Sequence, residues 1–425
     1  MTAVVTPLAL SLLGVAACAL SLAVISARPE LFVAALPLVL TLASLAWRRA
    51  TPDYSVSHEI SATRVFEGEG ATVTVAVSAR SPLPLIEVLA PVPSGAALVS
   101  GKNRAVLTLG AGETATFHYE LSFTARGVHG LAPIAARVTD RARVLGWERR
   151  HAASTLVRVY PKVSPLRSLP RPAHTQTSIG DYVSPALGEG IEPGDIREFA
   201  PGDRIKQVHW RASLRRGRLY VTQRQRERNA DVVLMLDTLA EVGAAPFTTL
   251  DASVRATAAL ATAYLARKDR VGLITYGGLL NWVKPASGRA QYERLADTLL
   301  RVRVAFTYVT RELILVPPRV LPPHALVIAI TPLLDPRFTK ATLDLAARGF
   351  DLAVLVVSPV DVLRATLRPS PVNQLACRLW QLDRRSHLDR LRRHAIAVTE
   401  WRPTVPLEEA LARLGRRRPR RVPAA

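Results

Sequence analysis

The chain has 425 residues, 49% of them hydrophobic, and its 56 lysines and arginines exceed its 34 aspartates and glutamates to give a formal net charge of +22. At about 150 residues per domain, this length allows two or three domains with cores of their own, which excludes a small disulfide-stabilised protein and a wholly disordered one. Two cysteines, Cys18 and Cys377, are too few for a disulfide framework or a cysteine metal cluster. Residues 1–47 contain only two charged side chains, Arg28 and Glu30, so the apolar and basic residues lie in different parts of the chain.

Residues 1–50 predict a transmembrane helical hairpin. Residues 8–27 and 31–47 carry no charge. At about 1.5 Å per residue, two helices of these lengths reach about 30 and about 26 Å, close to the hydrocarbon thickness of a bilayer. A cleaved signal peptide is the alternative, but no basic segment precedes Leu8 and a second apolar segment follows at once.

The charges that flank the predicted hairpin indicate its orientation. Arg48 and Arg49 directly follow the second apolar segment, whereas the loop between the segments holds one arginine. Because cytoplasmic flanks carry the excess of positive charge, we expect a two-pass protein of the plasma membrane with its soluble domains in the cytoplasm. A basic body on that side faces anionic lipid headgroups favourably.

Residues 51–165 predict a β-sandwich-like domain. Polar and β-branched residues alternate over 72–77, 105–109 and 116–123, and glycines and prolines separate these runs. Short alternating strands between turn residues are typical of an antiparallel sandwich. The segment contains no catalytic constellation, so we expect a packing or partner-binding module.

Residues 166–229 form a linker with a dense cluster of arginines and aromatic residues. Pro201, Gly202 and Asp203 predict a turn, because proline fixes φ, glycine tolerates positive φ and aspartate accepts backbone hydrogen bonds. Arginines interleaved with Trp210 are one way to bind single-stranded nucleic acid. The alternative is a buried Trp210, with the arginines solvated or paired with nearby carboxylates.

This segment resembles the signature of the bacterial family called domain of unknown function 58. The resemblance is carried by Arg197, Phe199, Pro201, Gly202, Asp203, Trp210 and Arg215. Leu214 departs from the family pattern, which has alanine before the arginine. Members combine membrane helices, a β domain and a von Willebrand factor A-like domain, and are typically encoded near MoxR-type AAA+ ATPases. The resemblance therefore implies a von Willebrand A-like fold and an AAA+ ATPase as partner.

Residues 230–405 predict an α/β domain. Apolar runs predict strands at 232–236, 271–276, 325–331 and 352–357, and helical periodicity predicts helices at 250–267 and 340–348. Continuous apolar strands that alternate with helices indicate a doubly wound, mainly parallel sheet covered on both faces. Such a sheet binds ligands at the carboxyl ends of its strands.

The resemblance also implies a metal-ion-dependent adhesion site at that edge, with an Asp-x-Ser-x-Ser loop. Here the loop runs from Asp237 and Thr238 to Glu241 without either serine, and Thr331 precedes a proline where a Ser-Asp pair is expected. Two interpretations remain open. One is a weak Mg²⁺ site formed by Asp237, Thr238, Glu241 and Asp335, and the other is a degenerate site in a protein-binding fold. We expect no cofactor, with Mg²⁺ as the doubtful exception.

Other catalytic motifs are absent from the sequence. It contains no G-x-x-x-x-G-K-[ST] phosphate loop, no G-x-S-x-G elbow and no H-E-x-x-H pair. His209 lies beside Trp210, and a histidine in this position is more often structural than catalytic. We therefore expect the protein not to be an enzyme.

Residues 406–425 predict a short helix and a basic tail. The basic residues of the tail are Arg416, Arg417, Arg418, Arg420 and Arg421. Such a run of like charges is usually disordered and is able to contact anionic lipid or nucleic acid.

The sequence thus predicts a membrane-anchored, cytoplasm-facing scaffold or adaptor that binds protein clients and works with a MoxR-type AAA+ ATPase in complex assembly or remodelling. One alternative is a membrane-tethered nucleic-acid-binding protein that uses the tail and Arg215, Arg216, Arg218 and Arg224. A second alternative is a weak activity that depends on a divalent cation at the degenerate site. We expect the positive charge to face the membrane and protein partners rather than nucleic acid.

Overall fold

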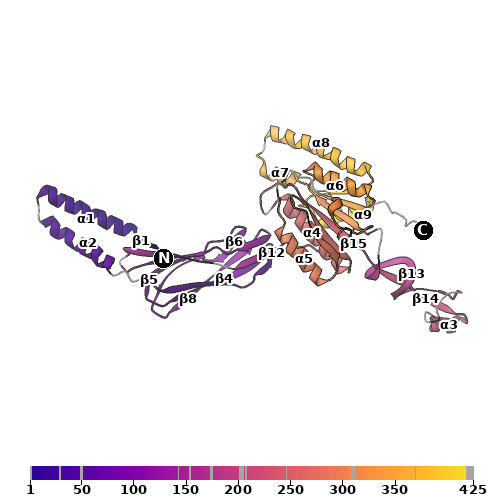
Figure 1. Ribbon diagram of the computed structural model, residues 1–425, viewed down its shortest axis with the longest axis horizontal. Coiled ribbons are helices and arrows are strands. Elements are labelled where there is room, and N and C mark those ends of the chain that lie inside the picture. The colour runs from indigo at the N-terminus through magenta and orange to yellow at the C-terminus, as the bar shows by residue number, and fades with distance from the viewer. Residues whose placement is uncertain are drawn as a thin grey trace. The chain divides into compact units, whose positions relative to one another are not determined.

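The computed structural model describes residues 2–27, 30–47, 51–141, 143–152, 155–172, 176–200, 205, 208–245, 247–305, 307, 313–368 and 370–417. The chain divides into two compact units, Met1–Tyr160 and Pro161–Ala425. Figure 1 shows the elements of both units along the chain.

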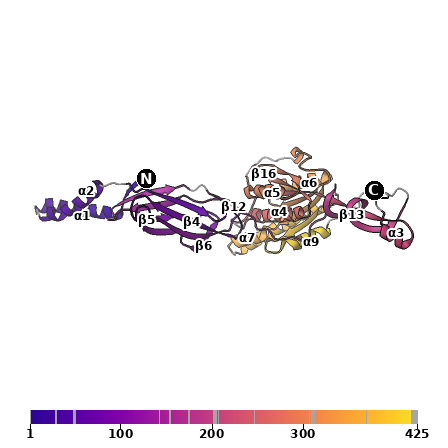
Figure 2. The ribbon, with the colours of Figure 1, turned by 90° about the horizontal axis from the view of Figure 1, so that it is seen from below.

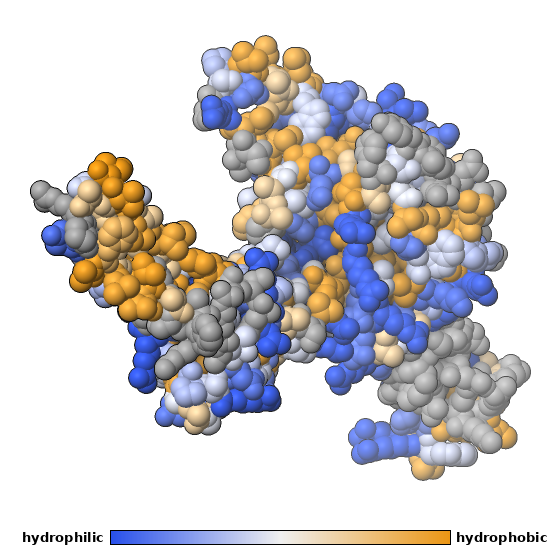
Figure 3. Space-filling model, turned by 60° about the vertical axis from the view of Figure 1, so that its left-hand side comes forward, coloured by the Kyte–Doolittle hydropathy of each residue, from blue (hydrophilic) through white to orange (hydrophobic). Residues whose placement is uncertain are grey.

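The first unit begins with a strand that leads directly into an apolar helix. Strand β1 (Thr2–Val5) is followed by α1 (Pro7–Ser26), and α2 (Glu30–Trp47) comes next. The hydroxyl of Thr6 caps α1 by accepting a 3.3 Å hydrogen bond from the Ala9 amide. Apolar side chains cover the surface of α1 and α2 (Figure 3).

One described helix, α1, is long and apolar enough to cross a membrane, with 20 residues and a mean hydropathy of 2.5. A membrane hairpin of two helices is therefore not shown within the described residues. Glu30 lies in the first turn of α2 and Pro37 lies inside it. A carboxylate shortens the uncharged length of α2, and an internal proline removes a backbone hydrogen bond from it.

The rest of the first unit consists of three β-sheets. One sheet has the order β1-β11-β10-β5-β7, a second β2-β4-β8-β6 and a third β3-β12-β9. The strands are β2 (Tyr54–Ile60), β3 (Arg64–Phe66), β4 (Gly70–Ala79), β5 (Leu83–Leu89), β6 (Ala96–Gly101), β7 (Arg104–Leu109), β8 (Thr114–Phe123), β9 (Gly127–Gly130), β10 (Ile134–Thr139), β11 (Leu145–His151) and β12 (Leu156–Tyr160). The first two sheets are antiparallel throughout and share one core, to which Val75, Ile86 and Leu121 contribute fully buried side chains.

The second unit contains a six-stranded sheet of order β17-β16-β15-β18-β19-β20. Its strands are β15 (Asp231–Thr238), β16 (Arg270–Gly277), β17 (Asn281–Ala286), β18 (Leu326–Thr331), β19 (Asp351–Val357) and β20 (Ala397–Trp401). The helices of this unit after β15 are α4 (Thr249–Ala266), α5 (Arg289–Arg301), the 3₁₀ turn η2 (Leu313–Leu315), α6 (Pro336–Ala347), α7 (Val360–Thr366), α8 (Pro371–Arg393) and α9 (Leu407–Arg417).

Helices cover both faces of this sheet (Figure 2). Alternate residues of β15 point to opposite sides, so Leu234 and Leu236 join a core with α4, α5 and α9. Val233 and Met235 join a second core with α6 and α8. All eight residues of β15 are buried, as expected of a central strand.

The expected fold was a doubly wound von Willebrand A-like domain that follows a β-sandwich-like domain and a transmembrane hairpin. The observed sheets contradict this expectation. The chain holds several antiparallel sheets, and the six-stranded sheet is mixed, because β17 runs antiparallel to β16. The connection from Gly277 to Asn281, which joins β16 to β17, is too short for a parallel crossover. The two strands therefore form an antiparallel hairpin. Lys284 and Pro285 interrupt the apolar pattern of β17, which is why the sequence did not reveal it.

A two-stranded antiparallel ribbon precedes the six-stranded sheet in the sequence. It pairs β13 (Gln176–Glu198) with β14 (Tyr220–Asn229), and α3 (Trp210–Arg216) lies in the connection between them. The ribbon and α3 together carry the segment that the sequence analysis identified as a signature.

Candidate functional site

A buried carboxylate lies at the carboxyl edge of the parallel strands. Asp237, near the end of β15, is 1% exposed. Its Oδ2 accepts a 2.6 Å hydrogen bond from the Thr331 hydroxyl at the end of β18, and its Oδ1 accepts a 3.0 Å bond from the Leu239 amide. Burial raises the pKa of Asp237 from 3.8 to about 7, although both hydrogen bonds oppose this rise. Because Asp237 is buried, its carboxyl group has little contact with solvent.

An ion pair lies at the same edge. Asp335 caps the start of α6 by accepting a 2.9 Å hydrogen bond from the Arg337 amide, and its carboxylate lies 2.6 Å from the Arg337 guanidinium. The hydrogen bond from Arg337 holds the pKa of Asp335 below its ordinary value. Arg337 also donates a 2.7 Å bond to the carbonyl of Thr307. The guanidinium is therefore the cation that Asp335 contacts.

The residues predicted to bind a cation meet only in part. Asp237 and Asp335 interact electrostatically at this edge, and the buried Thr238 follows Asp237. Glu241 is exposed in the loop after β15. Within the described part of the chain, no group of three or more His, Cys, Asp or Glu side chains is placed to hold a metal ion. Of the four predicted ligands, Asp335 is paired with Arg337 and Asp237 is hydrogen-bonded to Thr331.

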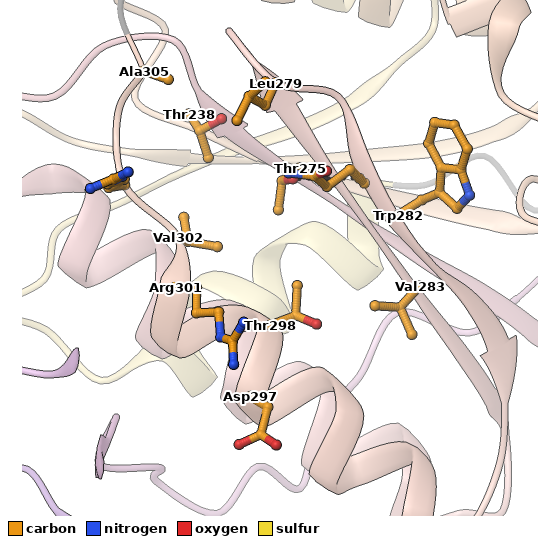
Figure 4. A pocket seen from close by; sticks show the side chains of 12 residues that line it. Thr238, Thr275, Leu279, Trp282, Val283, Asp297, Thr298, Arg301, Val302 and Ala305 are labelled. Atoms are coloured by element: carbon orange, nitrogen blue, oxygen red, sulfur yellow. Dashed lines mark hydrogen bonds between the residues drawn. The ribbon is translucent and has the colours of Figure 1, made fainter. Parts of the chain in front are cut away.

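A cleft of about 510 Å³ begins at Thr238 and extends between β17 and α5 (Figure 4). Its lining includes Trp282 from β17, Asp297 and Arg301 from α5, and Arg303 after the helix. Thr238 itself packs tightly against the next strand, because a Cβ added at Gly277 would lie 2.1 Å from its hydroxyl oxygen. The charged side chains of this lining are Asp297, Arg301 and Arg303, so the cleft carries both signs of charge.

The signature residues are described in part. Pro201, Gly202 and Asp203, the predicted turn, lie outside the described residues. Arg197 donates a 2.9 Å hydrogen bond to the carbonyl of Glu198. The amide of Phe199 donates a 2.8 Å bond to the carbonyl of Leu219, which ties the two sides of the ribbon together beside α3.

Polar contacts hold α3 in place. The Nδ1 atom of His209 accepts a 3.0 Å hydrogen bond from the Ala212 amide, which makes this histidine the helix N-cap. The buried Ser213 donates a 3.1 Å bond to the His209 carbonyl and accepts a 2.8 Å bond from the Tyr220 amide. Gly217 ends α3 at a φ of 69°. These contacts give His209 a structural position.

The apolar side chains of α3 face solvent instead of a core. Trp210 is 60% exposed and Leu214 is 83% exposed, one turn apart on the same side of the helix. The arginines around them, also exposed, are Arg211, Arg215, Arg216 and Arg218. From the sequence, Trp210 was expected either to belong to a nucleic-acid surface or to be buried. The four-residue spacing of Trp210 and Leu214, with arginines on either side, is the signal that could have revealed this α3 surface.

The predicted tail is described only at its start. Arg416 and Arg417 end α9. Arg418, Arg420 and Arg421 lie outside the described residues.

Comparisons with known proteins agree with the signature. Residues 195–363 match the family described as "Protein of unknown function DUF58". Uncharacterized proteins of Mycobacterium tuberculosis and Mycobacterium bovis are 27% identical to this chain over 190 residues, which cover 43% of this chain and 60% of each relative. The chain thus spans about 60% of the length of these curated relatives.

Two solved structures are similar to parts of the chain. The cupredoxin domain of amoB from Nitrosocaldus yellowstonii is 12% identical over 25% of this chain and 86% of its own, with a TM-score of 0.19. The CARDB domain of the PF1109 protein from Pyrococcus furiosus is 15% identical over 26% of this chain and 96% of its own, with a TM-score of 0.17. Likenesses at this level carry no functional argument.

Proposed function

We propose that the protein is a membrane-attached adaptor that binds a protein partner through the exposed surface of α3. The observation that carries this proposal is the exposure of Trp210 and Leu214 on a helix whose backbone is fixed by polar contacts. These two side chains contribute little to the core, and an exposed tryptophan beside arginines is typical of interaction surfaces.

The chemistry of the α3 surface defines the partner. Trp210 and Leu214 form an apolar centre that fits an apolar pocket or groove of the partner. The surrounding guanidinium groups fit acidic side chains at the rim of that pocket. The family resemblance supports a MoxR-type AAA+ ATPase as this partner. We place ATP hydrolysis in the partner, because this sequence has no phosphate loop.

Membrane attachment rests on α1. Its uncharged 20 residues are long enough to cross a bilayer. Because β1 pairs with β11 of the same unit, the start of α1 and the β-sheets lie on one side of that bilayer. We assign this side to the cytoplasm, where Arg48 and Arg49 satisfy the excess of positive charge next to the membrane.

Affinity capture of the full chain from gently solubilised membranes, with and without ATP, tests the adaptor function. We expect an AAA+ ATPase to copurify with the wild-type protein and its recovery to fall at least about tenfold with W210A/L214S, because buried aromatic anchors contribute about 2 kcal/mol or more. The matched control is F247A/L279S, which removes two side chains that are 71% and 65% exposed elsewhere in the same unit. Equal recovery with both double variants would refute the role of α3.

The exposed arginines of α3 support one rival function, the binding of single-stranded nucleic acid. Guanidinium groups beside an exposed tryptophan combine phosphate neutralisation with base stacking. Binding of this kind weakens linearly with salt on a log–log plot. Tight, salt-sensitive binding of single-stranded DNA by the full chain at physiological ionic strength, lost in W210A/L214S, would favour this rival over the adaptor.

A further inference from the structure

Helix α8 carries an exposed apolar face that its own unit does not cover. Val372, Leu375, Leu379 and Leu382 are 75%, 58%, 59% and 58% exposed. Their spacing of three, four and three residues is that of positions a and d over two heptads. α8 lies on the outer side of the helical layer that contains α6 (Figure 1).

The opposite face of α8 packs against the second unit. Leu388 and Leu391 belong to the core beside β18 and β19. Arg384, 4% exposed, lies 3.4 Å from Glu400 and donates to the carbonyl of Pro332. The hydroxyl of Ser370 caps the helix by accepting a 3.1 Å bond from the Asn373 amide. The exposed face therefore stands on a helix that is already formed, so a partner would not have to supply the free energy of helix nucleation.

We propose that this face of α8 pairs with the same face of a second copy of the chain, with the two helices parallel. Valine at the first a position and leucine at both d positions are compatible with a two-stranded pair. The contact is isologous, because each copy presents one surface to an identical surface. Two heptads span about 20 Å, so the proposed contact between the two helices is short.

The charges beside the apolar face favour the parallel arrangement. Arg378 occupies position g and Asp383 the e position five residues later, and in parallel helices these positions meet across the interface. Twofold symmetry gives two such ion pairs. Asp383 also lies 3.6 Å from His387 of its own helix. An antiparallel pair would bring g positions together, and these positions hold Arg378 and Arg385, which repel each other.

The same pattern limits the contact to the start of α8. The a position after Leu382 is Ser386, and the next g and e positions hold Arg385 and Arg390. In parallel helices these two arginines of opposite copies would repel. The apolar pairing therefore ends near Leu382, where each helix turns its buried face, with Arg384, toward its own sheet.

Sedimentation velocity of the full chain in detergent, over a range of concentrations, tests the pairing. We expect a reversible monomer–dimer equilibrium that L375A/L379A weakens at least about 100-fold, because each copy loses two leucine side chains from the buried contact. F247A/L279A removes exposed apolar groups elsewhere and should leave the equilibrium unchanged. A wild-type chain that stays monomeric at the highest concentrations would overturn the proposal.

A charge exchange tests the register of the pair. R378D and D383R each place like charges across the parallel interface and should weaken the dimer, whereas R378D/D383R should restore it. If the loss of dimer affinity in the double variant equals the sum of the losses in the two single variants, Arg378 and Asp383 do not meet and the proposed register is wrong.

Disulfide cross-linking tests the direction of the helices. In a C18S/C377S background, L375C should form a disulfide-linked dimer on oxidation, because equivalent d positions face each other only in parallel helices. A cross-link between chains carrying L375C and chains carrying L379C, without the L375C–L375C product, would establish an antiparallel pair and overturn the proposal.

Discussion

The hydroxyl of Thr331 donates a 2.6 Å hydrogen bond to the carboxylate of Asp237 across two neighbouring parallel strands, and both side chains are buried. Thr331 also accepts a 2.9 Å hydrogen bond from the Leu333 amide. The threonine thus connects the end of β15 with the loop after β18. The carboxyl group of Asp237 lies inside the sheet, and its burial, which the Thr331 hydrogen bond only partly offsets, makes the stability of the protein depend on pH.

The pH dependence of unfolding should change in D237N. The pKa of Asp237 is about 7 in the folded protein against 3.8 as its ordinary value. A proton on Asp237 therefore stabilises the folded state. This stabilisation is complete below pH 3.8 and is lost as the pH rises through 7. We expect the free energy of unfolding of D237N to rise relative to wild type between pH 4 and pH 8, as measured by chemical denaturation. D389N, at an exposed site, is the control, and a pH-independent difference for D237N would contradict the assignment.

Removal of the Thr331 hydroxyl should destabilise the protein. In T331V, Asp237 loses a donor and the Leu333 amide loses an acceptor, which costs about 1–3 kcal/mol for buried groups. The loss should be larger at pH 8 than at pH 5, because the carboxylate is then charged. T331S keeps the hydroxyl and should retain most of the stability in the same denaturation series. Equal losses in T331V and T331S would show that the methyl group, not the hydroxyl, matters.

The ion pair between Asp335 and Arg337 should show measurable coupling. Both side chains are largely buried, at 17% and 23% exposed, and D335N keeps a capping group for α6. A double-mutant cycle with D335N and R337A should give a coupling free energy of about 1–3 kcal/mol. Because Arg337 already neutralises Asp335, we expect Mg²⁺ to leave the wild-type thermal midpoint unchanged. A rise with Mg²⁺ that D237N abolishes would support the cation site instead.

Alanine at position 277 should disturb the packing of β16 against Thr238 of β15. The added Cβ would lie 2.1 Å from the hydroxyl oxygen and 2.9 Å from the carbonyl oxygen of Thr238. We expect G277A to lower the free energy of unfolding by about 1–3 kcal/mol, because a packed site does not accept an extra methyl group. G70A is the matched control, since its Cβ would meet the Leu121 carbonyl at an ordinary 3.5 Å. If both variants lose the same stability, the close approach at Gly277 is not the cause.

We expect His209 to stabilise α3 as its N-cap rather than to take part in catalysis. H209A removes the acceptor for the Ala212 amide and should cost about 1 kcal/mol of local stability. Hydrogen exchange of the α3 amides should therefore become about fivefold faster. H209N retains a side-chain acceptor and should exchange more slowly than H209A. Unchanged exchange in H209A would remove the capping role.

The local elements were predictable where a single periodicity governs the residues. Strand β4 alternates buried side chains with more exposed ones, and β15 and β18 each contain a continuous apolar run, so both patterns are visible in the sequence. The helix predicted at 250–267 matches α4, which a capping box of Thr248 and Asp251 begins. In each case the signal lies within about 20 consecutive residues, the range over which sequence periodicity is informative.

Long-range pairing and side-chain environment were not predictable. β1 precedes an apolar helix without any break in pattern, and its partner β11 lies far along the chain. Arg384 lies in a run of basic residues, yet it is buried and contacts Glu400 and the Pro332 carbonyl, which the sequence does not reveal. At the candidate site the sequence located Asp237 and Asp335, but not the ion pair of Asp335 with Arg337, because such a pair has no spacing motif.

The pairing of β1 with β11 sets an order of events during synthesis. Thr6 donates its hydroxyl hydrogen bond to the carbonyl of Arg143, which lies 137 positions away in the chain. α1 therefore leaves the ribosome long before the strand that holds its base exists. Closing a loop of this length is slow compared with forming a helix. The helix is thus complete before the chain is able to form the β-sheet that holds its first residues.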